Sequence, residues 1–242
     1  MQRIRAFPRT DGFPDAQRAP QVLWSKRMTR IALIHALVHS VAPINEALAR
    51  EWPQARRMNL LDDSLASDLA ASRRGLDAAM HARFAQLARY ALECGSNAIL
   101  FTCSAFGPCI EGVAREHPTV PVLKPNEAMI AQAASLGCRI GLVASFAPTL
   151  ASMPLEFPAS ADLACELVED AMRALDVGDA ARHDALVAAA AERLLNQGCA
   201  VIALAQFSMA RTRKLVAERT GLPVLTPVDS AVIELRRRLL KA

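Results

Sequence analysis

ECGSNAILFTCSAFG, residues 93–107, reappears in outline as NQGCAVIALAQFSMA, residues 196–210. Each stretch has a glycine, then a short apolar run, then a loop of small and polar residues. The two stretches align at a constant offset, so that Gly95 matches Gly198 and Ile99 matches Ile202. A short apolar run bounded by turn residues is typical of a strand that is buried on both faces.

Two further blocks repeat in the same order along the chain. RIALIHALVHS (30–40) matches RIGLVASFAPT (139–149), and PVLKPNEA (121–128) matches PVLTPVDS (223–230). Apolar strands resemble one another by chance, but glycines and prolines at matching places indicate a true repeat. The sequence therefore predicts a duplicated unit.

Strands alternate with helical segments in both halves, which is typical of parallel sheets in an α/β fold. Strands are predicted at 30–37, 97–102, 119–125, 139–145, 200–206 and 222–227, and 58–65 is predicted as a further strand with its exit loop. Helices are predicted at 44–52, 76–95, 126–137, 162–175, 183–198, 209–221 and 229–240. We expect two Rossmann-like lobes related by a pseudo-two-fold axis, with a cleft between them. The first lobe would comprise 30–123 plus 224–242, and the second 124–223.

The charge balance argues against a nucleic-acid partner. The chain has a formal net charge of +4, and residues 1–29 hold six basic and two acidic residues, so the remainder is neutral. Aromatic residues make up only 5% of the chain, too few for base-stacking platforms. Residues 1–29 contain three prolines and no periodicity, so we expect a flexible extension, and Met28 is an alternative start.

Apolar runs do not approach the length that spans a bilayer, and no secretory signal is visible, so we expect a cytoplasmic protein without membrane contact. The six cysteines form no C-x-x-C motif and no zinc-type cluster. Free thiols in a reducing compartment, and no metal site, are therefore expected.

Ligands of parallel sheets bind beyond the carboxyl ends of the strands, which places the candidate site in the matching loops. These loops are His35–Ala36 against Ala144–Ser145, and 103–105 against 206–208.

FTCSAFG (101–107), GLVAS (141–145) with Thr149, and IALAQFSMA (202–210) resemble the aspartate/glutamate racemase superfamily, which includes hydantoin racemases, maleate isomerases and arylmalonate decarboxylases. The resemblance covers about residues 30 to 240. It implies one cysteine in each of two matching loops, on opposite faces of the α-carbon of a small carboxylate substrate. It also implies that no cofactor is needed and that a homodimer is possible.

Cys103 matches the first cysteine of this family, and the position of the second falls on Gln206, as the internal offset also gives. Cys103 precedes a predicted helix, so backbone N–H groups and the helix dipole are expected to lower the pKa of its thiol. Gln206 cannot transfer a proton near neutral pH but can hydrogen-bond a carboxylate or an enediolate oxygen. Racemisation by two thiols is therefore excluded.

Three reactions remain open: decarboxylation with Cys103 as proton donor, covalent catalysis with Cys103 as nucleophile, and racemisation with another base such as His35 or His39. A decarboxylase of this superfamily keeps the cysteine of the second loop, the reverse of the present arrangement. We favour isomerase-type or related one-cysteine chemistry, with a decarboxylase or a non-catalytic carboxylate-binding protein as alternatives. The resemblance assigns the substrate carboxylate to the hydroxyls and amides of the same loops. The substrate-binding candidates are His35, Ser104, Ala105, Ser145, Thr149, Phe207 and Ser208.

Overall fold

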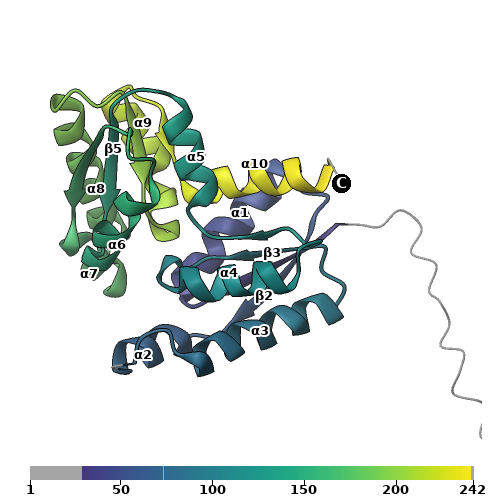
Figure 1. Cartoon of the computed structure of the whole chain (residues 1–242). Helices are drawn as coiled ribbons and strands as arrows, with labels where there is room; N and C mark the ends of the chain where they lie inside the picture. Colours follow the sequence, from purple (N-terminus) through teal and green to yellow (C-terminus); the bar gives the residue numbers. More distant parts are fainter. Residues whose placement is uncertain (1–28, 73, 241–242) are drawn as a thin grey trace, which may run out of the picture.

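The computed structural model describes residues 29–72 and 74–240 in two lobes, drawn side by side in Figure 1. The proposed extension 1–29 and the alternative start at Met28 fall outside the described residues, apart from Thr29. No helix in the described part of the chain is both long and apolar enough to cross a membrane.

The first lobe is built on a parallel sheet with the strand order β2-β1-β3-β4. Its strands are β1 (Arg30–His35), β2 (Arg56–Leu61), β3 (Ala98–Phe101) and β4 (Val122–Leu123). Side chains alternate across a strand, and both faces of this sheet are covered by helices, so the apolar runs of β1 and β3 are continuous.

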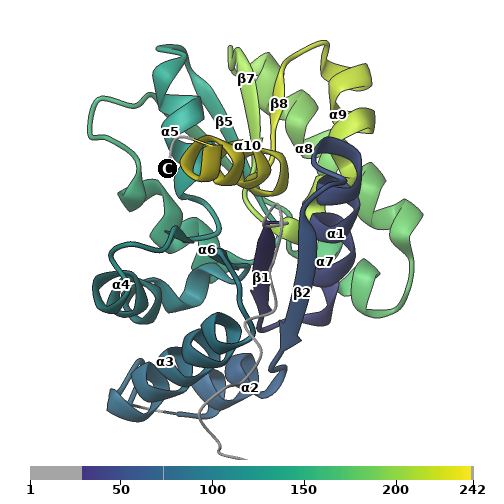
Figure 2. The same cartoon turned by 90° about the vertical axis from the view of Figure 1, so that its right-hand side faces the viewer.

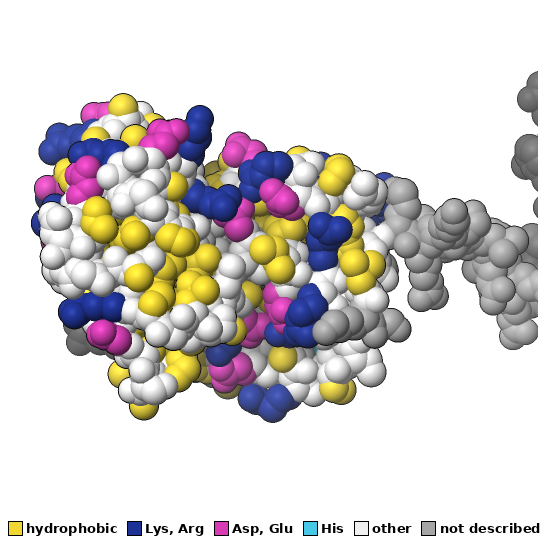
Figure 3. Space-filling view, turned by 90° about the horizontal axis from the view of Figure 1, so that it is seen from above, with side chains coloured by type: hydrophobic (Ala, Val, Ile, Leu, Met, Phe, Trp, Pro, Cys, Tyr) yellow, Lys and Arg dark blue, Asp and Glu magenta, His cyan; other side chains and the backbone are white. Residues whose placement is uncertain are grey.

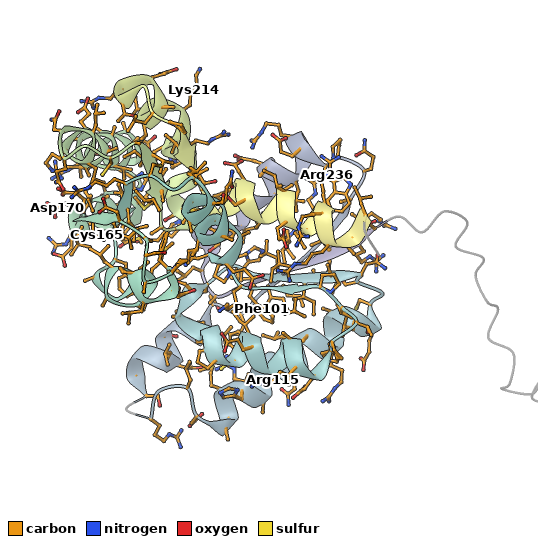
Figure 4. All side chains as sticks on the ribbon, turned by 45° about the horizontal axis from the view of Figure 1, so that its top comes forward. Phe101, Arg115, Cys165, Asp170, Lys214 and Arg236 are labelled. Atoms are coloured by element: carbon orange, nitrogen blue, oxygen red, sulfur yellow. The ribbon has the colours of Figure 1, made fainter. Side chains whose placement is uncertain are left out.

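Two helix layers bury the two faces of this sheet. One face, with Ile31 and Leu33, packs on α1 (Val41–Glu51) and on the C-terminal helix α10 (Pro227–Leu240). The other face packs on α2, α3 and α4. Their bounds are Ser64–Ala71, Ala78–Glu93 and Gly107–Glu116. Phe101 lies in this second layer, inside the first lobe (Figure 4), where its ring stacks on Phe84 with the centroids 5.2 Å apart.

The second lobe repeats this plan, with the strand order β6-β5-β7-β8. Its strands are β5 (Ile140–Ala144), β6 (Leu163–Leu167), β7 (Val201–Leu204) and β8 (Val224–Leu225). One face packs on α7, α8 and α9, and the other on α5, α6 and the short helix η3. These elements span Glu169–Asp176, Ala180–Asn196, Arg213–Thr220, Glu127–Ser135, Ala147–Ser152 and Met153–Glu156.

Two parallel sheets with the same strand order confirm the α/β fold and the two lobes expected from the repeat. The matching blocks of sequence become β1 and β5, β3 and β7, and β4 and β8. The helices α2 and α6 were not predicted, and one predicted helix is wrong. Residues 162–175, expected as one helix, form the strand β6 followed by α7. β6 lies at the edge of the sheet and pairs only with β5, so part of its surface is exposed. Its sequence therefore mixes buried and exposed residues in a pattern that resembles that of a helix.

The predicted boundary between the lobes needs one correction. Val224 and Leu225 pair with Ile202 and Ala203 of β7, so β8 belongs to the second sheet. The chain returns to the first lobe only after Thr226, where α10 begins.

Helices α5 and α10 cross between the lobes and lie side by side (Figures 1 and 2). After β4 of the first sheet, α5 covers a face of the second sheet, and after β8 of the second sheet, α10 covers a face of the first. Ser230 Oγ donates a hydrogen bond to Gln132 Oε1 (2.8 Å), and Arg238 pairs with Glu127 at 2.8 Å. Each lobe therefore supplies a helix to the core of the other.

Charged side chains of both signs are intermingled on the face shown in Figure 3, without a broad area of one sign. Such a surface gives no electrostatic footprint for a polyanion on that face.

Gly141 in β5 lies against the helix that covers it. A Cβ atom at this position would come within 2.9 Å of Ile202 Cδ1 and 3.0 Å of Leu194 Cβ. We therefore expect Gly141→Ala to lower the free energy of unfolding by about 1–3 kcal/mol, measured by urea denaturation. Gly107→Ala is the control, since a Cβ there meets no atom within 4 Å. Equal stability of Gly141→Ala and the unmutated protein would contradict this packing.

Candidate active site

Cys103 and Gln206 occupy the same place in the two lobes. Each follows the last residue of its strand, β3 or β7, by two positions. Each has an extended backbone, with φ/ψ of −126°/122° and −131°/148°, and each precedes a short 3₁₀ helix. These helices are η2 (Ser104–Phe106) and η4 (Phe207–Thr212). The carboxyl ends of matching strands thus present a thiol in one lobe and an amide in the other.

The Cys103 side chain is half-buried at the edge of an apolar layer. It lines a narrow pocket with no room for a water molecule, together with His35, Ala36, Phe101 and three other residues of the layer. Burial raises the pKa of the Cys103 thiol, and a hydrogen bond from the Ala105 backbone N–H opposes this shift without cancelling it.

The expectation of a lowered thiol pKa is therefore wrong. A backbone N–H does reach the sulfur, but the loss of water around the thiolate outweighs it. In the resting protein Cys103 is a neutral thiol at neutral pH, which can give a proton but has little thiolate with which to remove one.

Gln206 is held in one orientation by Ser145. Its Oε1 atom accepts hydrogen bonds from Ser145 N at 2.6 Å and from Ser145 Oγ at 2.9 Å. No group of the described residues accepts a hydrogen bond from Gln206 Nε2, so this atom is free to donate to a ligand. Ser145 itself is buried. The contact matches one in the first lobe, where Ala36 lies beside Cys103. Ser145 therefore orients the Gln206 side chain and is not itself exposed to a substrate.

His35 is fully buried and has partners at both ring nitrogens. Nδ1 lies 2.9 Å from Thr102 Oγ1, and Nε2 lies 3.0 Å from Asn59 Oδ1. Because Asn59 Oδ1 can only accept, Nε2 carries the proton and Nδ1 accepts from Thr102. Burial lowers the pKa of His35. His35 is therefore neutral and has no access to solvent. Its hydrogen bond holds Thr102, the residue directly before Cys103.

Of the remaining substrate-binding candidates, two line a pocket and two are buried. Ser104 and Ala105 line a pocket of about 310 Å³ between the lobes, which also includes Lys124, Asn126 and Glu156. Thr149 and Phe207 are buried, and Phe207 packs into the core layer of the first lobe, so its ring is not exposed to a ligand.

Ser208 is half-buried in η4, directly after Phe207. His39 is exposed, and its Nε2 lies 3.9 Å from Asp176 Oδ1 of the other lobe.

Sequence reasoning did not identify Asn59, Thr102, Lys124 or Asn126. Two of these had a usable signal in the sequence, since Thr102 is the last residue of the predicted strand 97–102 and Asn126 directly follows the predicted strand 119–125. Asn59 lies within a strand, and only its register beside β1 brings it near His35. Among the residues that the structure describes, no three His, Cys, Asp or Glu side chains lie together in a way that could hold a metal ion.

The raised pKa of Cys103 predicts slow alkylation. In the folded protein, we expect the rate of Cys103 modification by iodoacetamide to reach half its maximum above pH 8.5, the ordinary value for a thiol. Peptide mass spectrometry, with Cys103→Ser to assign the peptide, measures this rate separately from those of the other cysteines. Half-maximal modification below pH 8 would contradict the assigned environment.

Two buried histidines predict loss of stability in acid. Burial lowers the pKa of both His35 and His183, so below about pH 6.5 the unfolded chain binds protons that the folded chain does not. The free energy of unfolding should fall from pH 7 to pH 5, by up to about 1.4 kcal/mol per pH unit for each group. In urea denaturation, His35→Asn should reduce this slope, and an unchanged slope would contradict the assignment.

Comparisons with known proteins agree with this architecture. The model of the Asp/Glu/hydantoin racemase family matches residues 36–235. No curated protein matches the chain significantly in sequence.

Among solved structures, allantoin racemase from Klebsiella pneumoniae aligns with a TM-score of 0.66 and 17% identity over 88% of each chain. Glutamate racemase from Francisella tularensis aligns with a TM-score of 0.64 and 15% identity, over 88% of this chain and 82% of that one. An arylmalonate decarboxylase aligns with a TM-score of 0.58 and 15% identity, over 86% and 91%. The family model spans both lobes and both matching loops, and the chain therefore belongs to the Asp/Glu/hydantoin racemase family.

Proposed function

We propose that the chain is a cofactor-independent enzyme that acts at the carbon next to the carboxylate of a small acid, with Cys103 as its proton-transferring group. The observation that supports this most directly is the pair of equivalent positions after β3 and β7. One holds a neutral thiol and the other holds an amide fixed as a donor by Ser145. A thiol can exchange a proton, whereas an amide can only stabilise charge on oxygen.

Gln206 is placed to stabilise the negative charge that develops on the substrate during the reaction. When a bond to the α-carbon breaks, its electron pair spreads into the neighbouring carboxylate as an enediolate. Gln206 Nε2 is a preoriented donor for such an oxygen, since both donors that hold Oε1 come from Ser145. A fixed donor stabilises the transition state without reorganising during the step.

The absence of a proton-transferring side chain at position 206 determines the kind of reaction. Racemisation by two opposed thiols needs a second acid or base, and Gln206 is neither. Isomerase-type chemistry by this chain would therefore pass the proton through Cys103 on one face of the substrate. We assign the second cysteine position of the family to Gln206 as part of this proposal.

The raised pKa of Cys103 favours decarboxylation as the second candidate. In that reaction the bond from the α-carbon to one carboxylate breaks, CO₂ leaves, and the electron pair stays on the remaining enediolate. The Cys103 S–H then gives its proton to the α-carbon, and the thiolate regains a proton from water. Only an acid is needed, and a protonated thiol is the form that burial favours.

The proposal predicts that Cys103→Ala abolishes turnover. A panel of small carboxylic and dicarboxylic acids, incubated in D₂O and followed by proton NMR, reports exchange of the α-hydrogen. Release of CO₂ reports decarboxylation. For the acid that reacts, Cys103→Ala should lower kcat by at least about 10³-fold, since the proposed step depends on the proton of the Cys103 thiol.

Cys165→Ala is the matched control, because Cys165 is an exposed cysteine of β6, on the outer side of the second lobe (Figure 4). It should keep full activity. Circular dichroism and thermal unfolding would show that both variants remain folded. Full activity of Cys103→Ala would exclude the mechanism. Binding of a carboxylate without turnover of any acid would instead identify a non-catalytic binding protein.

A further inference from the structure

The pocket at the Cys103 loop continues into a second pocket. The first has a volume of about 310 Å³, and its lining includes Ala105, whose backbone N–H reaches the Cys103 sulfur. The second has a volume of about 380 Å³ and shares Lys124 and Glu156 with the first. We call the two together the interlobe groove. Ala105 and Asn126 line only the first pocket, so they lie on the Cys103 side of the groove and Glu156 lies further along it.

The interlobe groove carries a negative charge that has no partner. The described residues that line it include three glutamates and one lysine, namely Glu111, Glu127, Glu156 and Lys124. Lys124 Nζ pairs with Glu111 at 2.9 Å, and Glu127 pairs with Arg238 at 2.8 Å. Within the described part of the chain, Glu156 makes no ion pair and no hydrogen bond. The groove therefore lacks one cation.

The surroundings of Glu156 favour a cation over an anion. Partial loss of water raises the pKa of its carboxyl group, Lys124 lowers it, and the neighbouring Glu111 and Glu127 raise it further. A bound cation would offset the repulsion among these carboxylates, whereas a bound anion would add to it. The described residues do not place three metal-binding side chains together, so the cation that fits is an organic one, such as a protonated amine.

Asn126 adds an unused hydrogen-bond donor to the same groove. It stands at the N-cap position of α5, where asparagine is a preferred residue, but its side chain makes no capping hydrogen bond. The residue is only 2% exposed, and its Nδ2 atom has no partner in the described part of the chain. A buried donor without a partner is costly, and an oxygen atom of a ligand would supply the partner.

We propose that the substrate is a small acid whose substituent ends in a protonated amine, with an acid oxygen bound by Asn126 and the amine bound by Glu156. This inference rests on the proposed function, because it takes the pocket beside the Cys103 loop as part of the substrate site. The acid end lies at Asn126, on the Cys103 side, and the amine extends along the groove to Glu156. An ammonium group supplies three donors and the positive charge that the groove lacks.

The test measures equilibrium binding of three acids of equal length to the full chain by titration calorimetry. 5-Aminopentanoate ends in an ammonium group, hexanoate has a methyl group at the same place, and adipate has a second carboxylate there. We expect 5-aminopentanoate to bind at least about fivefold more tightly than hexanoate, and adipate to bind no more tightly than hexanoate.

Two substitutions separate the two ends of the ligand. Glu156→Gln should weaken binding of 5-aminopentanoate by at least about fivefold and leave binding of hexanoate unchanged, because it removes only the counter-charge of the amine. Asn126→Ala should weaken binding of both acids by at least about threefold and keep the preference for the amine, because it removes the donor to the acid oxygen. Circular dichroism and thermal unfolding would show that both variants are folded.

Glu93→Gln is the matched control. Glu93 is an exposed carboxylate at the end of α3, just before β3 begins, and so lies at the opposite end of the first sheet from the Cys103 loop. Its substitution removes the same charge from the chain and should leave the binding of all three acids unchanged.

The outcomes separate this inference from the proposed function. Failure of 5-aminopentanoate to bind more tightly than hexanoate, or a preference that Glu156→Gln retains, would overturn the inference even if an acid is turned over through Cys103. A preference that Glu156→Gln abolishes and Glu93→Gln retains, without turnover of any acid, would support the amine site and refute the enzyme proposal.

Discussion

Each sheet needs a helix that the other half of the chain supplies. The face of the first sheet with Ile31 and Leu33 is covered in part by α10, which follows the last strand of the second sheet. The corresponding face of the second sheet is covered by α5, which follows the last strand of the first. Parallel strands are stable only when both faces are buried, so neither lobe has a complete core without this exchange.

The exchange also joins the two lobes along one pair of helices. Because α5 and α10 lie side by side and are joined by hydrogen bonds, the sheets are held close at one end. Phe207, in the loop after β7, extends from the second lobe into the core of the first.

Duplication makes the site similar in backbone and different in chemistry. Cys103 and Gln206 have nearly the same backbone conformation, but only the thiol can exchange a proton. Their surroundings differ as well. The second lobe has Ser145 to orient the amide, whereas the first has Ala36 at the matching place and leaves the thiol beside hydrocarbon. The proposed division of roles, with proton transfer by Cys103 and charge stabilisation by Gln206, rests on this difference.

The sequence alone determined the repeat and the α/β class, because strand periodicity and the spacing of glycine and proline are local properties. It placed Cys103 and Gln206 at matching strand ends for the same reason. It missed β6, whose edge position gives a weak local pattern, and it assigned β8 to the wrong sheet, because pairing partners are not local.

Only the tertiary structure decided how these residues behave. Burial raises the pKa of Cys103 despite its helix-start position, and the partners Thr102 and Asn59 make His35 a neutral support. Desolvation and long-range hydrogen bonds depend on atoms distant in sequence, so no local pattern contains them.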